Sequence, residues 1–415
     1  MPTINAPAPN GVDDHAVLQA LVDHGRPYGQ FTTDGVEIAL DRGVYRLSQS
    51  LDLSNAHGVH IRGQGMHTTE MRALGDFSVI RAEGSPTEPL NQAGIKGLTI
   101  RGFGNDQPGS YGIMLKWTNR CAVEDVLFFS CMLGMVVSHA WQTKLTNLQA
   151  TGGGADRCRH GVYMSQSSSE YIDNAVIATG CTMQDCIETG FRIVNGQGSK
   201  FTACEAGGTK YGWYIGDTTG GVKNTWLHID NCLADTAEIG WLIQSDNDLG
   251  EMILCNLWTG NCTEAGMVIR NAKNLQVNGV IAISHHREAV RLEGCQHVSL
   301  SQVSAKDYNR IDVGAACIRL TDSQNCTVSN VNAVSIHPTT VARETGTSDR
   351  NLLSTLTGKP ELIGANSRFS AALDAPIQVP VYGVLPSTAP AGQLAYDSGT
   401  GKLVFSNGAA WIPTT

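Results

Sequence analysis

A short pattern recurs along this chain, and it restricts the possible folds more than any other feature. In each copy a glycine precedes three mostly apolar residues, from Tyr111-Gly-Ile-Met-Leu115 to Ala265-Gly-Met-Val-Ile269. The glycines occupy positions 112, 134, 161, 190, 212, 240 and 266, and Ala289 and Cys317 continue the series. Eight steps cover the 205 residues from 112 to 317, so the mean period is about 26 residues. Repeats of this length are typical of solenoids and related repeat folds.

A second pattern lies between these copies. It is a short alternating strand with Asn, Asp or Gln near its end, such as Leu145-Thr-Asn-Leu148 and Val328-Ser-Asn-Val331. Alternation with period two indicates β-strands. Two short strands per repeat, with no helix between them, predict stacked coils of a parallel β-solenoid. Each coil should advance by about 4.8 Å, the spacing between neighbouring strands.

Alternation along the first strand predicts which side chains face the interior. The residues one and three places after the glycine are uniformly apolar, so we expect one interior ladder through Ile113, Val162, Phe191, Trp213 and Trp241. The glycine and the residues two places before and after it should then face outward. A column of outward glycines has two interpretations. It can meet a backbone need for positive φ, or it can form a shallow shelf where a long chain lies close to the backbone.

The two ends of the chain lack the regular repeat. Asp13 to Gly25 predicts an amphipathic helix with Asp13 as N-cap and an apolar stripe of Val17, Leu18, Leu21 and Val22. Such a helix can cover the open end of a solenoid. We predict an N-terminal cap over residues 1–57, coils over 58–335, a connector over 336–378 and a small β-rich module over 379–415. Ser398-Gly-Thr-Gly401 and Ser406-Asn-Gly408 predict hairpin turns in that module.

Two segments resemble known families. Asn10-Gly-Val-Asp-Asp-His-Ala-Val-Leu-Gln-Ala-Leu-Val22 is similar to the entry segment of pectate-lyase-like right-handed β-helices, although one residue is missing between Val12 and Asp13. The stretch from Gln393-Leu-Ala-Tyr-Asp397 to Trp411 resembles the small C-terminal module of phage tail proteins. The resemblance implies an all-β, right-handed parallel β-helix with a capping helix and a C-terminal β module. It also implies a phage tailspike or prophage-borne polysaccharide depolymerase.

The same resemblance implies how the protein assembles and where it acts. Tailspike-like proteins are typically homotrimers, and the C-terminal module carries many apolar residues that threefold association would bury. We therefore expect a homotrimer that is made in the host cytoplasm, joins the virion tail and acts outside the cell. Its expected partners are a bacterial surface polysaccharide and other phage tail proteins. The alternative is a monomer whose C-terminal module folds back on the solenoid.

Composition excludes several other classes of protein. The net charge of −9 opposes sequence-independent binding to nucleic acid or to an anionic membrane. No stretch of about 20 apolar residues predicts a membrane span. The start of the chain shows no secretory signal, so we expect the 12 cysteines to be free, buried thiols. No Cys-x-x-Cys pair, P-loop or dinucleotide fingerprint occurs, and we predict neither a metal site nor a cofactor.

The outward positions carry side chains that can bind a glycan. Tyrosine and arginine can contact sugar rings, hydroxyls or a glycan carboxylate. Arg159 and Lys210 precede the glycine column, and Tyr163, Arg192 and Tyr214 follow it. Three further candidates for stacking on sugars fall off the inward row: Trp117, Trp141 and Trp258. A solvated face with charges of alternating sign explains the same pattern without a ligand.

Paired carboxylates are the candidate catalytic groups. Hydrolysis of a glycosidic bond requires two carboxyl groups, about 5–5.5 Å apart for retention and about 6.5–9.5 Å apart for inversion. Stacked rows can supply either separation, because one coil step is about 4.8 Å. Glu238 and Glu264 share a row on adjacent coils, and Glu188 lies two coils before Glu238. Asp217 and Asp246 form a second pair, placed after their glycines on adjacent coils.

Three functions fit these residues. The first is an endo-acting glycosidase of the tailspike kind. The second is a polysaccharide lyase or a fructan transferase of the β-helix class, in which Lys210, Arg192, Arg159 and His160 can neutralise a uronate or act as base. The third is a receptor-binding spike without catalytic activity. The fold cannot choose among them.

Overall fold

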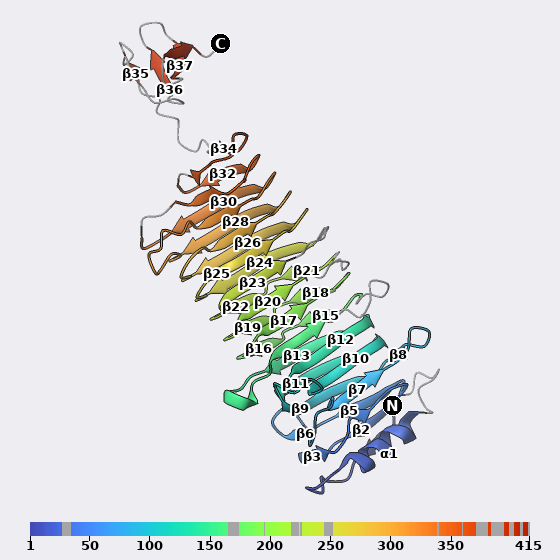
Figure 1. Ribbon diagram of the computed structural model, residues 1–415. Helices are drawn as coiled ribbons and strands as arrows, with labels where there is room; N and C mark the ends of the chain where they lie inside the picture. The colour runs from blue at the N-terminus through green and yellow to red at the C-terminus, as the bar shows by residue number, and fades with distance from the viewer. Residues whose placement is uncertain are drawn as a thin grey trace. The chain divides into compact units, whose positions relative to one another are not determined.

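The computed structural model describes residues 1–26, 35–164, 174–194, 196–216, 224, 226–244, 252–337, 340–358 and 360–370, with short strands beyond. The chain divides into two units, Met1–Ser370 and Ala371–Thr415. The first unit is a stack of parallel β-coils with one α-helix among its described residues, α1 (His15–Gly25) (Figure 1). The predicted all-β parallel β-helix, with its helix and its C-terminal β module, is confirmed.

One long sheet contains the repeating glycine pattern, and we call it sheet B. Neighbouring strands pair in parallel, and each comes from the next coil. Strand β8 (Leu90–Asn91) pairs with β10 outside the main order. In chain order the other strands are β4 (Leu51–Asp52), β7 (Ile80–Glu83), β10 (Tyr111–Asn119), β12 (Leu133–Trp141), β14 (His160–Met164), β17 (Thr189–Ile193), β20 (Tyr211–Ile215), β23 (Ile239–Gln244), β25 (Ala265–Arg270), β27 (Val290–Glu293), β29 (Ile318–Thr321), β31 (Ala342–Thr345) and β33 (Pro360–Glu361).

The second long sheet, sheet A, contains the pattern that ends in a polar residue. Its strands also pair in parallel from coil to coil. They are β1 (Thr3–Asn5), β2 (Val36–Ala39), β3 (Gly43–Leu47), β5 (Val59–Arg62), β6 (Thr69–Ala73), β9 (Gly94–Gly104), β11 (Ala122–Cys131), β13 (Lys144–Ala150), β15 (Ile177–Thr179), β16 (Thr182–Gln184), β18 (Lys200–Thr202), β19 (Glu205–Gly207), β21 (His228–Asp230), β22 (Leu233–Asp235), β24 (Ile253–Gly260), β26 (Gln276–Ile283), β28 (Ser299–Lys306), β30 (Thr327–Val334), β32 (Leu352–Leu356) and β34 (Arg368–Ser370).

A single residue in the left-handed conformation divides each coil of sheet A into two halves. In β24 this residue is Asn256, with φ of 51°. Asparagine, aspartate and glycine tolerate this region better than other residues, which explains the recurring polar residue in the sequence. Successive coils place these residues in one column: Gly97, Asp125, Asn147, Gly180, Ala203, Asn231, Asn256, Gly279, Gln302, Asn330 and Thr355. The column forms a corner along the outside of sheet A.

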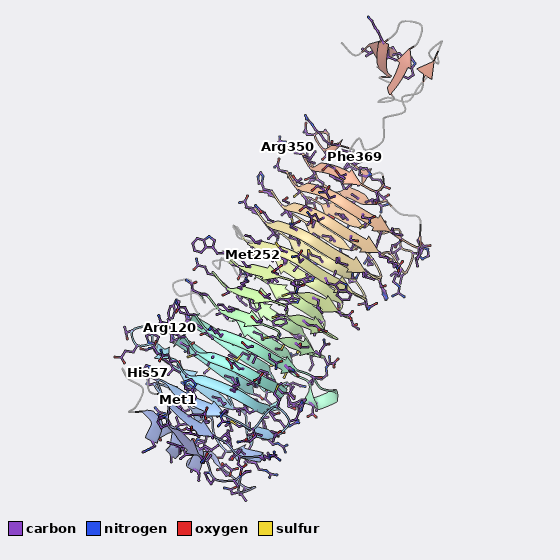
Figure 2. The ribbon with its side chains drawn as sticks, turned by 180° about the vertical axis from the view of Figure 1, so that it is seen from behind. Met1, His57, Arg120, Met252, Arg350 and Phe369 are labelled. Atoms are coloured by element: carbon purple, nitrogen blue, oxygen red, sulfur yellow. The ribbon has the colours of Figure 1, made fainter. Side chains whose placement is uncertain are left out.

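Another corner joins sheet B to the first half of sheet A. Arg120, with φ of 55°, and Arg350, with φ of 57°, occupy it on distant coils. Figure 2 shows both residues, together with Met252, along one edge of the stack. Every coil therefore turns at similar places, which keeps the strands in register over the whole unit.

The interior ladder agrees with the prediction. The five expected residues are all fully buried. The register pairs Val162 with Phe191, Phe191 with Trp213, and Trp213 with Trp241. The rings of Phe191 and Trp213 stack with centroids 4.0 Å apart, and those of Trp213 and Trp241 with centroids 4.8 Å apart. Offset stacks of this kind stabilise a core beyond the burial of their area.

The predicted outward orientation of the glycines is wrong. All seven are buried, and none has positive φ. A Cβ atom on Gly112 would lie 2.7 Å from the Phe128 ring, and one on Gly212 would lie 2.8 Å from the Cβ of Ala234. Both neighbours are interior residues of sheet A. The glycine is therefore required because the two sheets come close inside each coil, and it does not form an external shelf.

The two ends also correct the sequence prediction. Helix α1 begins at His15 with Asp14 as N-cap, and Val17 is exposed while Leu18 and Val22 are buried. Asp13 accepts a hydrogen bond from the His15 backbone instead. Parallel coils continue beyond Ser335, because β31 pairs with β29 and β34 pairs with β32. The predicted connector is thus wrong as far as Ser370.

The second unit contains the short strands that the sequence predicts. They are β35 (Val381–Tyr382), β36 (Leu394–Asp397), β37 (Lys402–Ser406) and β38 (Trp411–Pro413). Strands β36 and β37 pair antiparallel, and so do β37 and β38, as the expected hairpins require.

The cysteines agree with the expectation of free thiols. All twelve are free, and only Cys255 is not fully buried. Among the described residues, no helix has the length and apolar character that crossing a membrane requires. The described residues also include no group of three or more His, Cys, Asp or Glu side chains placed to hold a metal ion.

Candidate functional site

The predicted row of charged residues lies on the outside of the turn that enters sheet B. Backbone hydrogen bonds connect neighbouring coils along it. The Glu188 N–H donates to the Arg159 carbonyl, the Glu238 N–H to the Lys210 carbonyl, and the Glu264 N–H to the Glu238 carbonyl at 2.9 Å. The structure therefore places Glu238 and Glu264 on adjacent coils, with Lys210 and Glu188 on the two coils before them.

The carboxylates of this row differ in their surroundings. Glu238 is exposed, and its carboxylate makes no ion pair within the described residues. Glu264 binds the Arg291 guanidinium at 2.9 Å, and Glu188 binds Arg159 at 2.8 Å. The other predicted pair, Asp217 and Asp246, lies outside the described residues.

The residues that follow the glycine column form an aromatic and basic cluster on the outer face of β14, β17 and β20. The register pairs Tyr163 with Arg192 and Arg192 with Tyr214. The Arg192 guanidinium lies 3.6 Å from the centre of the Tyr214 ring and donates to the Gly216 carbonyl. Lys210 lies 5.3 Å from the centre of the Tyr211 ring. Such cation–π contacts hold flat rings and cations next to one another on the surface.

His160, which the sequence suggests only as a lyase residue, lies at the edge of this cluster. His160 contacts Tyr163 edge to face, and its Nδ1 is 2.7 Å from the Thr189 hydroxyl. Burial outweighs the opposing charge of Glu188 and lowers the pKa of His160 to about 4, and the charges of Arg159 and Arg192 act in the same direction as burial. His160 is therefore neutral at pH 7.

An ionic network covers the outer face of β25, β27 and β29. Arg291 and Glu288 are almost completely buried, with their charged groups 2.8 Å apart. Burial opposes ionisation of Glu288, but the hydrogen bond and charge of Arg291 and the charge of Arg319 hold its pKa below the usual value. Arg291 also bonds Glu264, so this network fixes one of the two predicted carboxylates.

The three candidate tryptophans lie in different surroundings. Trp117 is 9% exposed, and its ring stacks on His139 with centroids 3.9 Å apart. Trp141 lines a hollow of about 410 Å³ together with Pro86, Pro89 and Arg120. Trp258 lines a larger groove on sheet A. The structure therefore does not bring the three rings together in one site.

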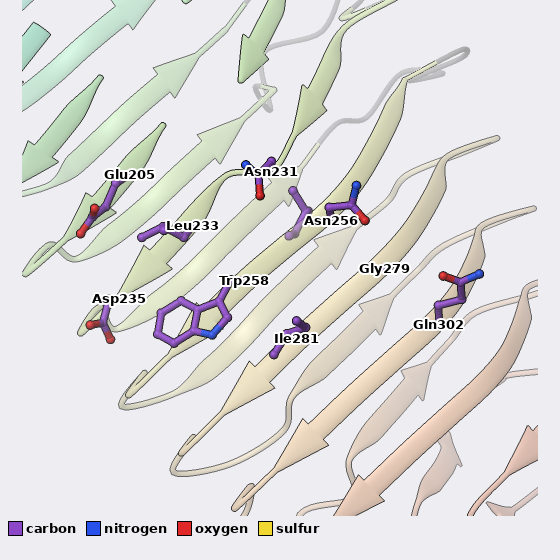
Figure 3. Close-up of a pocket in the computed structure, with 10 residues that line it drawn as sticks. Glu205, Asn231, Leu233, Asp235, Asn256, Trp258, Gly279, Ile281 and Gln302 are labelled. Carbon is purple, nitrogen blue, oxygen red and sulfur yellow. The ribbon is translucent and has the colours of Figure 1, made fainter. Parts of the chain in front are cut away.

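The groove at Trp258 was not predicted from the sequence, apart from that residue. Its volume is about 660 Å³, and Figure 3 shows it along the corner of sheet A. One side consists of residues from the left-handed column, and the other consists mainly of the first outward residues of the second half of sheet A, with Asp235 beyond them and Leu257 beneath. The lining residues are Glu205, Asn231, Leu233, Asp235, Asn256, Leu257, Trp258, Gly279, Ile281 and Gln302.

No protein-family model matches the chain, and no curated protein matches it in sequence. Solved structures share its fold. Tailspike protein 3 of bacteriophage CBA120 superimposes with a TM-score of 0.59 at 12% identity, over 98% of this chain and 67% of that one. The Dettilon tailspike protein gives a TM-score of 0.54 at 12% identity, over 89% and 68% of the two chains.

The chain has the β-helix fold of these tailspike proteins. A third similar structure is DFA-IIIase from Arthrobacter chlorophenolicus A6 in complex with GF2, with a TM-score of 0.55 at 12% identity, over 88% of this chain and 98% of that one. The resemblance stated from the entry segment is thus confirmed for the fold. Proteins with one fold can have different functions, so the function of this chain has to be inferred from the residues of its candidate site.

Proposed function

We propose that this protein binds a bacterial surface polysaccharide along the outer face of sheet B and cleaves it as an endo-acting glycosidase. The observation that carries the proposal is the position of Glu238 and Glu264 in one row on adjacent coils. Two carboxylates about one coil step apart fit the short separation that a retaining glycosidase uses. The cluster of Tyr163, Arg192 and Tyr214 lies on preceding coils, where it can bind the glycan beside the cleaved bond.

The two carboxylates differ in a way that suggests separate roles. The ion pair with Arg291 suits Glu264 to act as the ionised nucleophile that attacks the anomeric carbon. With Glu264 as nucleophile, the acid–base role falls to Glu238, which has no cationic partner in the described part of the chain and would protonate the leaving oxygen and then activate water. This assignment predicts retention of configuration at the cleaved bond.

A lyase is the second candidate, and the neutral His160 favours it. A lyase base removes the C5 proton of a uronate, while nearby cations neutralise the sugar carboxylate. His160 is neutral at pH 7 and lies beside Tyr163, with Arg159 and Arg192 close enough to affect its pKa. The elimination would leave an unsaturated sugar at the new end.

The chemistry of the products separates these candidates. The purified full chain is incubated with capsular and lipopolysaccharide polysaccharides. A new reducing end supports the glycosidase. An ultraviolet-absorbing unsaturated end supports the lyase and overturns the glycosidase. Binding without either product supports a receptor-binding spike, which is the third candidate. Transfer to a second sugar, without net hydrolysis, indicates a transferase.

We further propose that the protein acts as a homotrimer in a virion tail and contacts other tail proteins. The second unit supports self-association, because its strands form only a small four-stranded sheet. A unit of about 45 residues buries little apolar surface by itself. The mass of the full chain in solution tests the trimer.

A further inference from the structure

The groove on sheet A has the chemistry of a carbohydrate site that is separate from the face of sheet B. We infer that it binds an uncharged segment of a glycan. The inference does not require that the protein cleave the glycan, because it concerns only binding. The groove crosses the coils of β19, β22, β24, β26 and β28, so it extends for about 19 Å along the stack.

Trp258 provides a flat apolar surface in the groove. Its indole ring lies over Gly260, where a Cβ atom would be 2.2 Å from the Trp258 Cη2 atom. Glycine at position 260 therefore lets the ring lie along the strand. Trp258 is half-buried, so part of the ring remains open to the groove (Figure 3). Leu233 and Ile281 occupy the same column on the coils before and after it.

Polar side chains surround this surface. The two acidic ones, Glu205 and Asp235, accept hydrogen bonds from uncharged amide groups. The Gln184 amide donates to one oxygen of Glu205 at 2.7 Å, and the Asn261 amide donates to one oxygen of Asp235 at 3.1 Å. Within the described residues, the other oxygen of each carboxylate has no hydrogen-bond partner, and neither group forms an ion pair. These oxygens can accept hydrogen bonds from hydroxyl groups.

Amide groups occupy the opposite side of the groove. Asn231, Asn256 and Gln302 belong to the left-handed column, so their side chains recur at the spacing of the coils. An amide both donates and accepts hydrogen bonds, which suits a chain of hydroxyl groups. Ligand pockets typically combine apolar or aromatic surface with a few polar groups that fix the ligand, and this groove has such a composition.

The charge of the groove selects among glycans. Among the described residues, its lining contains Glu205 and Asp235 and no lysine or arginine. Unpaired like charges across an interface are unfavourable, so uronate, sulfate or phosphate groups are disfavoured there. The cations of the sheet B cluster, Arg159, Arg192 and Lys210, lie on a different sheet. We therefore expect the groove to take the uncharged part of a polysaccharide.

A peptide is a poorer occupant than a glycan. Peptides that add to a β-sheet use the free backbone groups of an edge strand. The groove lies in the middle of sheet A, where neighbouring coils already pair β22 with β24 and β24 with β26. Recognition must therefore come from side chains.

The test compares Trp258→Ala with a matched tryptophan elsewhere on the surface. Trp226 is 54% exposed and does not line the groove, so Trp226→Ala is the control. The probes are purified bacterial surface polysaccharides, sorted into neutral and acidic ones, and binding is followed by tryptophan fluorescence. We expect neutral polysaccharides to bind the wild type, with an affinity at least about tenfold lower for Trp258→Ala and unchanged for Trp226→Ala.

Further variants separate this site from the proposed cleavage site. Trp258→Tyr keeps a ring and should lose less affinity than Trp258→Ala. Asp235→Asn removes one of the two negative charges of the groove, so it should narrow the difference in affinity between neutral and acidic polysaccharides. Equal loss in Trp258→Ala and Trp226→Ala, or no binding of neutral polysaccharides at all, would overturn the inference. So would loss of cleavage with unchanged affinity in Glu205→Gln or Asp235→Asn, because the groove would then be the catalytic site.

Failure of the cleavage proposal has a different signature. If the protein releases no product but the Trp258 variants lose affinity for a neutral polysaccharide, the glycosidase proposal is wrong and the inference that the groove binds glycan is supported. Thermal melting of each variant shows that a loss of affinity does not come from unfolding. The backbone carbonyl of Trp258 accepts a hydrogen bond from the buried Trp241 indole, and substitution of the Trp258 side chain leaves that carbonyl in place.

Discussion

The indole nitrogen of Trp241 donates a hydrogen bond of 3.3 Å to the backbone carbonyl of Trp258. Trp241 belongs to the interior ladder, whereas the Trp258 side chain faces the external groove. On the preceding coil, the Trp213 indole donates in the same way to the Leu233 carbonyl at 3.1 Å. The stacked core rings therefore fix the strands that carry the groove.

Substitution of Trp241 should destabilise the coils around the groove. We expect Trp241→Phe to cost about 1–3 kcal/mol, because it leaves a void and removes the indole hydrogen bond. Thermal melting measures the loss. Trp226→Ala, on the surface, should change stability by less than about 0.5 kcal/mol. Equal melting temperatures for Trp241→Phe and wild type would contradict the tight packing of the ladder.

Substitution in the glycine column tests the corrected orientation. Gly212→Ala should destabilise the protein by about 1–3 kcal/mol, because its Cβ would lie 2.7 Å from the Gly240 carbonyl oxygen and 2.8 Å from the Ala234 Cβ. Gly153→Ala is the control, because nothing lies within 4 Å of its Cβ and its φ is −125°. If the glycines formed an external shelf, Gly212→Ala would leave the melting temperature unchanged.

The two predicted carboxylates should be needed for cleavage. In the glycosidase, Glu238→Gln and Glu264→Gln should each lower the rate at least about 100-fold, the low end for a positioned acid or base. Measurement of new reducing ends gives the rate. Melting should change little, because Glu238 is exposed and glutamine at the half-buried position 264 can keep the hydrogen bond to Arg291.

Matched substitutions show whether the loss is specific. Glu124→Gln removes a surface carboxylate that pairs with Lys96 on the outside of sheet A, and it should keep full activity. Asp217→Asn and Asp246→Asn test the second predicted pair in the same assay. Full turnover in all four variants would show that neither pair of carboxylates is catalytic and that the catalytic site lies elsewhere.

Much of the fold could be predicted, because the alternation of apolar and polar residues and the repeat of about 26 residues both follow from how the coils pack. The ladder through Phe191, Trp213 and Trp241 follows from apolar residues at fixed offsets. The glycine orientation could not be predicted in this way, because Gly112 and Ile113 are both buried and the simple alternation fails at the glycine. The last coils were missed because β31 and β34 contain mostly polar or exposed residues, and backbone pairing holds them in the stack.

The groove was missed for a different reason. Glu205 and Asp235 lie in strands of three residues, too short to show a period. Their juxtaposition depends on the register, which pairs Glu205 with Leu233 and Leu233 with Trp258. The recurring polar residue offers a signal that could have found it. Alignment of the coils on Asn231 and Asn256 places Leu233 and Trp258 in one column.

Acid should destabilise the native state through buried histidines. His285 is fully buried, and its Nδ1 accepts a hydrogen bond from the Cys262 N–H at 3.3 Å. Burial lowers the pKa of His285 from the ordinary value of 6.5 to about 4; a backbone hydrogen bond to Thr259 opposes burial, and the neighbouring His286 acts in the same direction as burial. Between pH 6.5 and 4 the unfolded chain therefore binds a proton that the native protein does not. The contribution of His285 to stability is complete above pH 6.5 and falls by about 3 kcal/mol toward pH 4.

Melting at pH 7 and pH 4.5 measures this effect. His160, whose pKa is also about 4, contributes in the same direction. His285→Gln removes one of these groups and should reduce the difference between the two melting temperatures, whatever its effect at pH 7. His228→Gln, at an exposed position, should leave the difference as it is in the wild type. An unchanged difference in His285→Gln would refute the role of this residue.

The second unit should be responsible for assembly. Its β-sheet is small, and its sequence includes Val379, Tyr382, Trp411 and other apolar residues that a trimer contact can bury. Light scattering of the full chain should give three times the monomer mass. A chain truncated after Ser370 keeps β34 and its pairing with β32, so its coils should remain folded. That truncated chain should be a monomer. A monomeric full chain would exclude the homotrimer, and a trimeric truncated chain would place the main contact on the coils instead.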